Sequence, residues 1–260
     1  MLKQDSRTGL KLVILLAIVF VVWVVPDLSG QDIAMISSDL TYIALTVFLT
    51  VTAFYQVAQA HNSGRGILIW VIFSVFAMFY TAAQHIWAVN ELIFGTRPFP
   101  SLADVAFLAD SLCLIAFFML YIQSLGKKIT KKMLLIAVLP SIVVVGVSAY
   151  SYVLSNSTDP IFIQVLLFSY PFLDAIALVP AMLGIMIWSK ERPNLSLLAI
   201  CSSMIPLATG DTLFQLTSQN NTYFTGSLPD FFFYVQIVLL TFGVYLMSNS
   251  MKSNVREEPI

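Results

Sequence analysis

Three aspartates, Asp110, Asp174 and Asp211, stand inside long apolar stretches of this 260-residue sequence. A carboxylate without a partner is costly in such a setting, so each is expected to be protonated, partnered or turned toward a water-filled cavity. The chemistry open to these groups is exchange of a proton or binding of a cation. His85 also lies in an apolar stretch, where it can bind a ligand or form a hydrogen bond between helices.

Two further aspartates belong to a short motif that occurs twice. Ser101-Leu-Ala-Asp104 and Ser227-Leu-Pro-Asp230 each precede an aromatic-rich apolar run, and the two aspartates are 126 positions apart. The pattern Ser-x-x-Asp at the start of a helix is typical of a capping box, in which the two side chains satisfy free backbone N–H groups. For Asp104 and Asp230, a role in capping therefore competes with a role in ligand binding.

The sequence lacks the patterns that indicate a common catalytic centre. It has no glycine-rich phosphate loop, no HExxH and no GxSxG. Its two histidines, His61 and His85, are too few for a site with three histidine ligands. We therefore predict that the chain is not an enzyme. The sequence identifies no cofactor or metal and leaves a carboxylate-rich cation site open.

The elements that must position these residues are membrane-spanning helices. Hydrophobic residues make up 58% of the chain, charged residues only 10%, and the mean hydropathy is +0.87. A soluble domain of this size needs many more charges on its surface, whereas lipid accepts the apolar excess. The composition thus predicts a polytopic membrane protein in contact with the lipid bilayer. A net charge of −1 argues against a nucleic-acid partner.

A membrane-spanning helix needs about 20 mostly apolar residues, and an open strand cannot satisfy its backbone in lipid. The expected helical spans are 9–26, 36–59, 67–92, 103–125, 133–154, 161–189, 195–217 and 229–249. The predicted fold is therefore an all-α bundle of eight transmembrane helices in one integral membrane domain (1–260), with a short cytoplasmic tail at 250–260. The prolines expected to kink spans or to leave a carbonyl unbonded are Pro140, Pro171, Pro180 and Pro206.

The basic residues indicate the orientation of the bundle. With eight crossings, every lysine and arginine except Arg97 falls on the side of the two termini, including the four lysines of the segment 127–132. By the positive-inside rule, this distribution predicts a cell-membrane protein with both termini in the cytoplasm. The four-lysine loop is expected to contact anionic lipid headgroups or a cytoplasmic protein.

The spacing of the spans also indicates an internal repeat. Shifting the centre of each of the first four spans by 126 positions lands within the matching later span. Because four is an even number, the halves 9–125 and 133–249 would run in the same direction, as a parallel 4+4 repeat. Tyr170, Pro171 and Asp174 have no counterparts 126 positions earlier, so the pocket is not expected to be two-fold symmetric.

Polar side chains gather in the outward half of the predicted bundle when depth is estimated at about 1.5 Å per residue. We therefore predict an acidic half-pocket that opens outward. Its expected ligand-binding residues are His85, Asp104, Asp110, Tyr170, Asp174, Asp211 and Asp230. Asp39 and Glu91 are expected to be solvated helix ends. The aromatic runs 73–80 and 231–234 are assigned to packing and to the membrane interface.

Four motifs occur in order along the chain: Pro98-Phe-Pro-Ser-Leu-Ala-Asp104, Ser169-Tyr-Pro-Phe-Leu-Asp174, Gly210-Asp211 and Thr225-Gly-Ser-Leu-Pro-Asp230. In these motifs the chain resembles the multi-helix sensory membrane region found ahead of diguanylate cyclase, phosphodiesterase or kinase domains in some bacteria and archaea. The resemblance implies a sensory function with an unidentified ligand, and the recurring positions are Asp104, Tyr170, Pro171, Asp174, Asp211 and Asp230. Unlike that pattern, the chain ends at Ile260 without an output domain, so it is expected to signal through a separate protein.

Three hypotheses for function follow. The first is a membrane sensor or ligand-binding module, in which a small molecule or cation shifts the helix packing and a cytoplasmic signalling protein detects the shift. The second is a structural subunit of a larger membrane complex, in which Asp110, Asp174 and Asp211 pair with neighbouring chains. The third is a secondary transporter, because parallel repeats, kinked helices and Asp174 near the midplane fit alternating access. An intramembrane enzyme ranks last, since no nucleophile, base and metal occur together.

Overall fold

The structure is a computed structural model that describes residues 2–63, 66–154, 159–190 and 194–257. These residues form helices and no strands, and eight segments are long and apolar enough to cross a membrane. The helices are α1 (Leu2–Ser29), α2 (Gln31–Ser63), α3 (Ile67–Leu92), α4 (Leu102–Ser124), α5 (Lys131–Leu154), α6 (Ile161–Lys190), α7 (Leu195–Ser202), α8 (Met204–Gln219) and α9 (Leu228–Glu257). The predicted all-α polytopic bundle is confirmed.

The seventh span is two helices rather than one. α7 and α8 are separated by Ser203 alone, and Pro206 follows in the first turn of α8. Proline has no N–H to donate to the carbonyl four residues earlier, and its ring crowds that carbonyl, so the helix breaks at this point. Helices α5 and α6 continue through their internal prolines, Pro140, Pro171 and Pro180.

Several helix ends lie beyond the predicted limits; α1, for example, begins at Leu2 and not at residue 9. α2 begins at Gln31, because Gly30 alone turns the chain from α1 into α2. The φ angle of Gly30 is +115°, a conformation that glycine adopts easily and other residues avoid. At the other end of the chain, α9 continues to Glu257 and so takes up most of the segment expected to be a tail.

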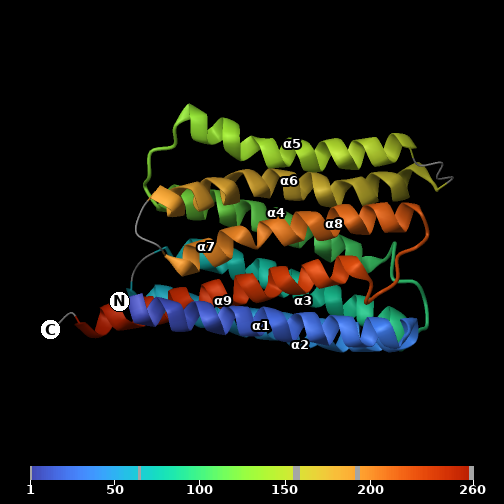
Figure 1. Ribbon diagram of the computed structural model, residues 1–260, viewed down its shortest axis with the longest axis horizontal. Coiled ribbons are helices and arrows are strands. Elements are labelled where there is room, and N and C mark those ends of the chain that lie inside the picture. Colours follow the sequence, from blue (N-terminus) through green and yellow to red (C-terminus); the bar gives the residue numbers. More distant parts are fainter. Residues whose placement is uncertain (1, 64–65, 155–158, 191–193, 258–260) are drawn as a thin grey trace.

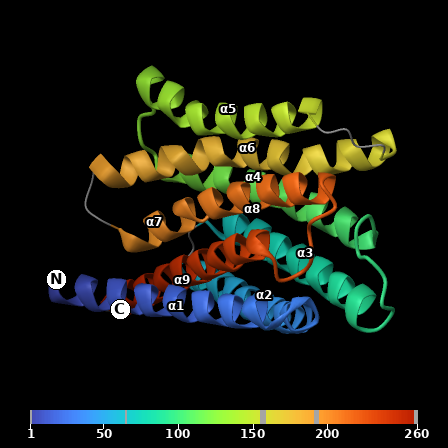
Figure 2. The same ribbon diagram turned by 45° about the vertical axis from the view of Figure 1, so that its right-hand side comes forward.

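The helices lie side by side along the long axis of the molecule, with both termini at the same end (Figure 1). We call this the proximal end; the distal end is the opposite one, where α3 leads into α4 and α8 into α9. In both views, α5 lies at one edge of the bundle and α1 with α2 at the other (Figure 1, Figure 2). Between them, α3 packs against α2 and α4, α9 against α2, α7 and α8, and α6 against α4, α5 and α8.

The eight crossings place the loop with Lys127 and Lys128 at the proximal end, as the sequence predicts. Arg97 follows α3 and lies at the distal end. Two other basic residues assigned to the proximal side, Arg65 and Arg192, lie outside the described residues.

The two edge helices present an apolar outer surface. Val13 and Val21 of α1 are more than half exposed, as are Leu135, Leu139 and Val143 of α5. Soluble proteins rarely leave so much contiguous apolar surface in water. Together with the eight spans, this surface identifies a membrane-embedded protein whose outer helices contact lipid.

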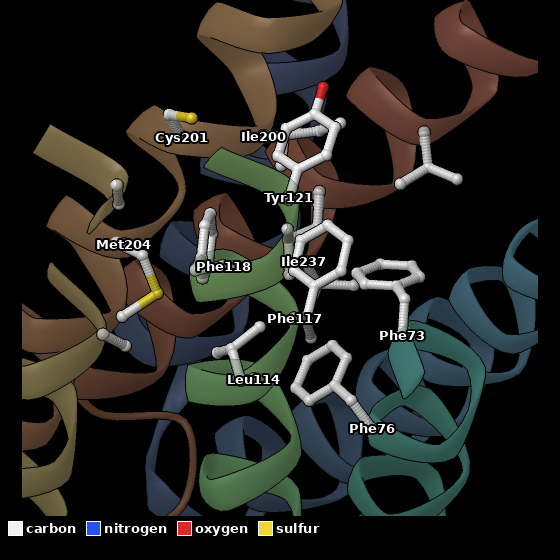
Figure 3. Close-up of a cluster of buried hydrophobic side chains, with 14 of the residues drawn as sticks. Phe73, Phe76, Leu114, Phe117, Phe118, Tyr121, Ile200, Cys201, Met204 and Ile237 are labelled. Atoms are coloured by element: carbon white, nitrogen blue, oxygen red, sulfur yellow. The ribbon is translucent and has the colours of Figure 1, made fainter. Parts of the chain in front are cut away.

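The proximal half of the bundle is filled by aromatic and aliphatic side chains (Figure 3). Phe117 of α4 packs on Phe73 of α3, with ring centroids 4.8 Å apart, and on Tyr121, with centroids 5.3 Å apart. Ile200 and Met204 complete the same cluster from α7 and α8, and both are fully buried. This packed cluster separates the proximal end from the distal half of the bundle.

We predict that Gly243→Ala destabilises the fold, because α9 passes close to α7 at this glycine. A Cβ at position 243 would lie 2.6 Å from Cγ1 of Ile200 and 2.9 Å from its backbone nitrogen, so the helices would have to separate. The Ser196 hydroxyl, which donates to the Gly243 carbonyl oxygen over 2.7 Å, would be displaced with them. We expect a loss of about 1–3 kcal/mol, measured as a lower melting temperature in detergent micelles.

Gly146→Ala is the matched control. Gly146 lies inside α5, and a Cβ at this position would have nothing within 4 Å. Alanine is favoured over glycine in a helix by roughly 1 kcal/mol, so this variant should melt at the wild-type temperature or above it. Equal melting of the two variants would contradict the close approach of α7 and α9.

Candidate functional site

Six helices enclose a cavity in the distal half, which we call the inner pocket. Its volume of about 70 Å³ is several times what one water molecule needs, so it has room for a few waters or a small ligand. The lining residues are Tyr42, Phe76, Tyr80, Gln84, Trp87, Phe107, Asp110, Ser111, Tyr170, Leu207, Asp211, Phe214, Tyr223, Asp230, Phe233 and Gln236. Nine of these sixteen side chains are aromatic, three are acidic and none is basic.

A wider hollow, the vestibule, lies at the distal end next to the inner pocket. Its volume is about 700 Å³, and it is lined by the start of α2, the α3–α4 loop and the α8–α9 loop. Trp87 and Tyr223 line both spaces, so these two side chains form the partition between them. Arg97 and Glu91 line the vestibule but not the inner pocket.

A short series of hydrogen bonds holds the partition. The indole N–H of Trp87 donates to the Thr225 hydroxyl over 3.0 Å, and that hydroxyl donates to a Glu91 carboxylate oxygen over 2.9 Å. The Tyr223 ring packs edge-on against Phe214, with centroids 4.7 Å apart. Because Trp87 belongs to α3 and Thr225 to the α8–α9 loop, movement of this loop away from α3 would open the partition.

The hydroxyl of Tyr223, in the partition, points toward the carboxyl group of Asp230. Burial raises the pKa of the Tyr223 hydroxyl well above its ordinary value, so the group keeps its proton. Its oxygen lies 3.4 Å from Oδ1 of Asp230. The partition thus presents a hydrogen-bond donor, and not a second anion, to this carboxyl group.

Asp230, in the first turn of α9, accepts two closer hydrogen bonds. The Tyr42 hydroxyl donates to Oδ1 over 2.6 Å, and the backbone N–H of Gly226 donates to Oδ2. The predicted capping box is wrong for this copy of the motif. The N–H of Ser227 already donates to the carbonyl of Phe224, so the carboxyl group bonds the N–H of Gly226 instead.

Asp104 forms the predicted capping box at the start of α4. Its Oδ2 accepts the backbone N–H of Ser101, and the Ser101 hydroxyl accepts an N–H from the first turn of the helix. The Tyr170 hydroxyl of α6 donates to the other carboxyl oxygen. The pairs Tyr170–Asp104 and Tyr42–Asp230 therefore have the same form, with a buried tyrosine bonding an aspartate that begins a helix.

Asp174 and Asp211 form a pair of carboxyl groups. Their side chains lie next to each other, and Asp174 is only 2% exposed. Two ionised carboxylates are both acceptors, so this contact requires a proton between them. Asp211 faces the inner pocket from α8, and Asp110 faces it from α4. In the part of the chain that the structure describes, no three histidine, cysteine or acidic side chains are placed to hold a metal ion.

Asp39 and Glu91 form a second pair of carboxyl groups beside the partition. The prediction of a solvated helix end is wrong for Asp39, which is 1% exposed and whose carboxyl neighbour is Glu91. The reason is that α2 begins at Gln31, so Asp39 lies about two turns inside the helix and not at its end.

The seven predicted ligand-binding residues occupy three kinds of position. Those that line the inner pocket are Asp110, Tyr170, Asp211 and Asp230. Asp104 and Asp174 lie behind its wall, as the partners of Tyr170 and Asp211. His85 lines neither space, and its Nδ1 is 2.7 Å from the carbonyl oxygen of Thr81, one turn earlier in α3.

Most of the aromatic lining is missed by the sequence prediction. The run 73–80 is assigned to packing, yet Phe76 and Tyr80, one helical turn apart, line the pocket. Their spacing is a signal that could have placed them on one face of α3. Gln236 is missed as well, although it lies 126 positions after Asp110 and so occupies the matching place in the proposed repeat.

No family model, curated protein or solved structure matches this chain. The geometry and chemistry of the inner pocket therefore provide the basis for a proposed function.

We predict that the Asp174–Asp211 pair makes the stability of the protein depend on pH. As the pH rises from about 5 to 9, the folded protein must keep the shared proton or hold two buried charges, whereas the unfolded chain ionises freely. The melting temperature of wild type should therefore fall, with a cost of up to about 1.4 kcal/mol per pH unit.

Asp211→Asn tests this prediction, because the amide can donate to Asp174 without a titrating proton. Its melting temperature should change less with pH than that of wild type. Asp27→Asn is the control, since Asp27 lies near the distal end of α1 and lines neither space. Identical profiles for all three proteins would contradict the shared proton.

Proposed function

We propose that this protein is a membrane-embedded ligand-binding module that acts as a sensor. The observation that carries the proposal is the inner pocket, an acidic and aromatic cavity that Trp87 and Tyr223 separate from the vestibule. Small-molecule sites are typically concave and largely apolar, with a few placed polar groups that fix the ligand. The inner pocket meets this description, with Asp110, Ser111 and Gln236 among its polar groups.

The packed proximal half favours a binding module over a secondary transporter. Alternating access requires polar groups that continue toward the second side of the membrane. Proximal to Asp110 in α4 lie Leu114 and Phe117, and proximal to Gln236 in α9 lies Leu240. All three side chains are buried and apolar. These three side chains form an apolar layer between the inner pocket and the buried polar residues of the proximal half, such as Gln56 and Ser248.

The burial of the aspartates weighs against a purely structural subunit of a larger complex. That hypothesis requires Asp110, Asp174 and Asp211 to pair with neighbouring chains. Asp110 is 6% exposed and Asp174 is 2% exposed, and Asp174 already pairs with Asp211 inside this bundle. The groups that would join the partner chains therefore face the interior of this one.

The pocket also supports the proposal that the bundle contains two related halves, 9–125 and 133–249. Positions 126 residues apart contribute Phe107 and Phe233, and likewise Asp110 and Gln236, to the pocket wall. The two tyrosine–aspartate pairs each join one half to the other. Such a match fits parallel repeats related by an axis along the membrane normal.

The helices that bear these residues connect the pocket with the proximal end. α4 runs from Asp110 toward the loop that holds Lys127 and Lys128, and α9 runs from Gln236 to Glu257. A ligand that binds better to one arrangement of α4 and α9 would shift the population toward it, and the proximal loop would move with α4.

The basic proximal loops favour the cytoplasm for this end of the bundle. In this proposal the distal vestibule faces outward, and a cytoplasmic signalling protein detects the movement of the proximal loop. The protein would thus work like the sensory membrane regions that its sequence resembles, through a separate partner.

We predict that a small solute bound in the inner pocket raises the melting temperature of wild type, and that Ser111→Phe abolishes the shift. Ser111 lines the pocket, so a phenyl ring at this position would take up ligand space. A ligand at 100 times its Kd stabilises the protein by about 2.7 kcal/mol. A thermal-shift screen of amines, sugars, carboxylic acids and metal ions would detect this change.

Ser189→Phe is the control for the added ring. Ser189 is exposed in the last turn of α6 and lines neither space, so this variant should respond to ligands as wild type does. The proposal fails if no class of solute shifts wild type, or if every active solute shifts Ser111→Phe equally.

A further inference from the structure

Two buried acceptors in the inner pocket have no hydrogen-bond partner. Oδ2 of Asp110 and Oε1 of Gln236 receive no hydrogen bond, although the two side chains are only 6% and 1% exposed. Both residues line the cavity, from α4 and α9 respectively. A buried acceptor without a donor costs about 1–3 kcal/mol, so these two oxygens favour a ligand that supplies donors.

The charges around the cavity restrict that ligand further. Asp110, Asp211 and Asp230 contribute carboxyl groups to the wall, and no lysine, arginine or histidine lines it. Asp230 is satisfied by Tyr42 and Gly226, and Asp211 is paired with Asp174, so Asp110 is the carboxyl group left for a ligand. A pocket with this lining disfavours anions and favours a cation that donates hydrogen bonds.

The aromatic walls select the kind of cation. A metal ion requires several oxygen ligands at short distances, and no three acidic, histidine or cysteine side chains among the described residues are arranged to supply them. An organic cation instead gains from aromatic faces, which attract its charge and accept its hydrocarbon part. Phe76, Tyr80, Phe107, Phe214 and Phe233 supply such surfaces around Asp110 and Gln236.

We propose that the inner pocket binds a small organic ammonium ion, that is, a protonated amine with a short hydrocarbon part. This inference rests on the proposed function and names the ligand class of the same pocket. The ammonium N–H groups donate to the free oxygens of Asp110 and Gln236, and the hydrocarbon part lies against the aromatic rings. The ligand enters from the vestibule when the contact between Trp87 and Thr225 opens.

The test compares n-butylammonium with butan-1-ol, two probes of nearly equal size that differ in charge. Isothermal titration calorimetry of the full chain in lipid nanodiscs, at neutral pH, measures the Kd of each. We expect n-butylammonium to bind at least tenfold more tightly than the alcohol. Asp110→Asn should lose this difference, because the amide keeps the size of the side chain but cannot become an anion beside the ammonium group. Asp27→Asn, which changes an acid outside both spaces, should retain it.

Gln236→Leu provides a second variant in case Asp110→Asn does not fold. It removes the second free acceptor and should weaken n-butylammonium at least threefold while leaving butan-1-ol unchanged. Equal affinity of the two probes for wild type would overturn the ammonium inference, as would unchanged n-butylammonium binding to Asp110→Asn.

The thermal-shift screen with Ser111→Phe separates this failure from failure of the proposed function. If sugars or other neutral solutes stabilise wild type but not Ser111→Phe, while amines have no effect, the pocket binds ligands of another class and only the ammonium inference is wrong. If no solute of any class acts through the pocket, both proposals are wrong.

Discussion

A carboxyl group inside a membrane-spanning bundle must find a hydrogen-bond donor or keep a proton, because lipid and apolar side chains offer neither water nor counter-ions. This constraint accounts for the arrangement of the distal half. Asp104 and Asp230 each take a tyrosine hydroxyl and a backbone N–H. Asp174 and Asp211 form a pair of adjacent carboxyl groups. The helices that carry these pairs are thereby fixed to one another across the bundle.

The pairs also define what remains available to a ligand. Apart from the paired carboxyl groups, Asp110 and Gln236 line the inner pocket and each carries a buried acceptor oxygen without a hydrogen-bond partner. The proximal half has the opposite character, since its core is built from rings and aliphatic side chains around Phe117. The acidic side chains thus gather in the distal half, whereas the polar contacts of the proximal half, such as Ser248 with Gln56, involve neutral groups.

The spans and most of the acidic residues were predictable because both stand out from their surroundings. Lipid imposes a length and an apolar composition on every span, and a charge within a span is conspicuous for the same reason. Asp110, Asp211 and Asp230 could thus be assigned to a pocket before the fold was known. The short turn at Gly30 could not, because one residue between two helices leaves no loop composition to detect.

The neutral part of the pocket was harder to predict for a related reason. Aromatic side chains are abundant in membrane helices, so Trp87 and Phe214 do not differ in kind from residues that only pack. Tyr42 was not predicted, because a shift of 126 positions from Tyr170 leads to Ala44. The tyrosine that bonds Asp230 is Tyr42, two positions before Ala44. The contacts in the fold, and not positions along the chain, show which tyrosine bonds which aspartate.

The central claim is that the inner pocket communicates with the distal end and is closed toward the proximal end. The most direct measurement is labelling of Ser111→Cys by a membrane-impermeant methanethiosulfonate, in a background where Cys113 and Cys201 are replaced by alanine. In membrane vesicles of known orientation, the claim predicts labelling from the distal side and no labelling from the proximal side. Labelling from the proximal side would contradict the claim and would support a transporter whose pocket is open to both sides of the membrane.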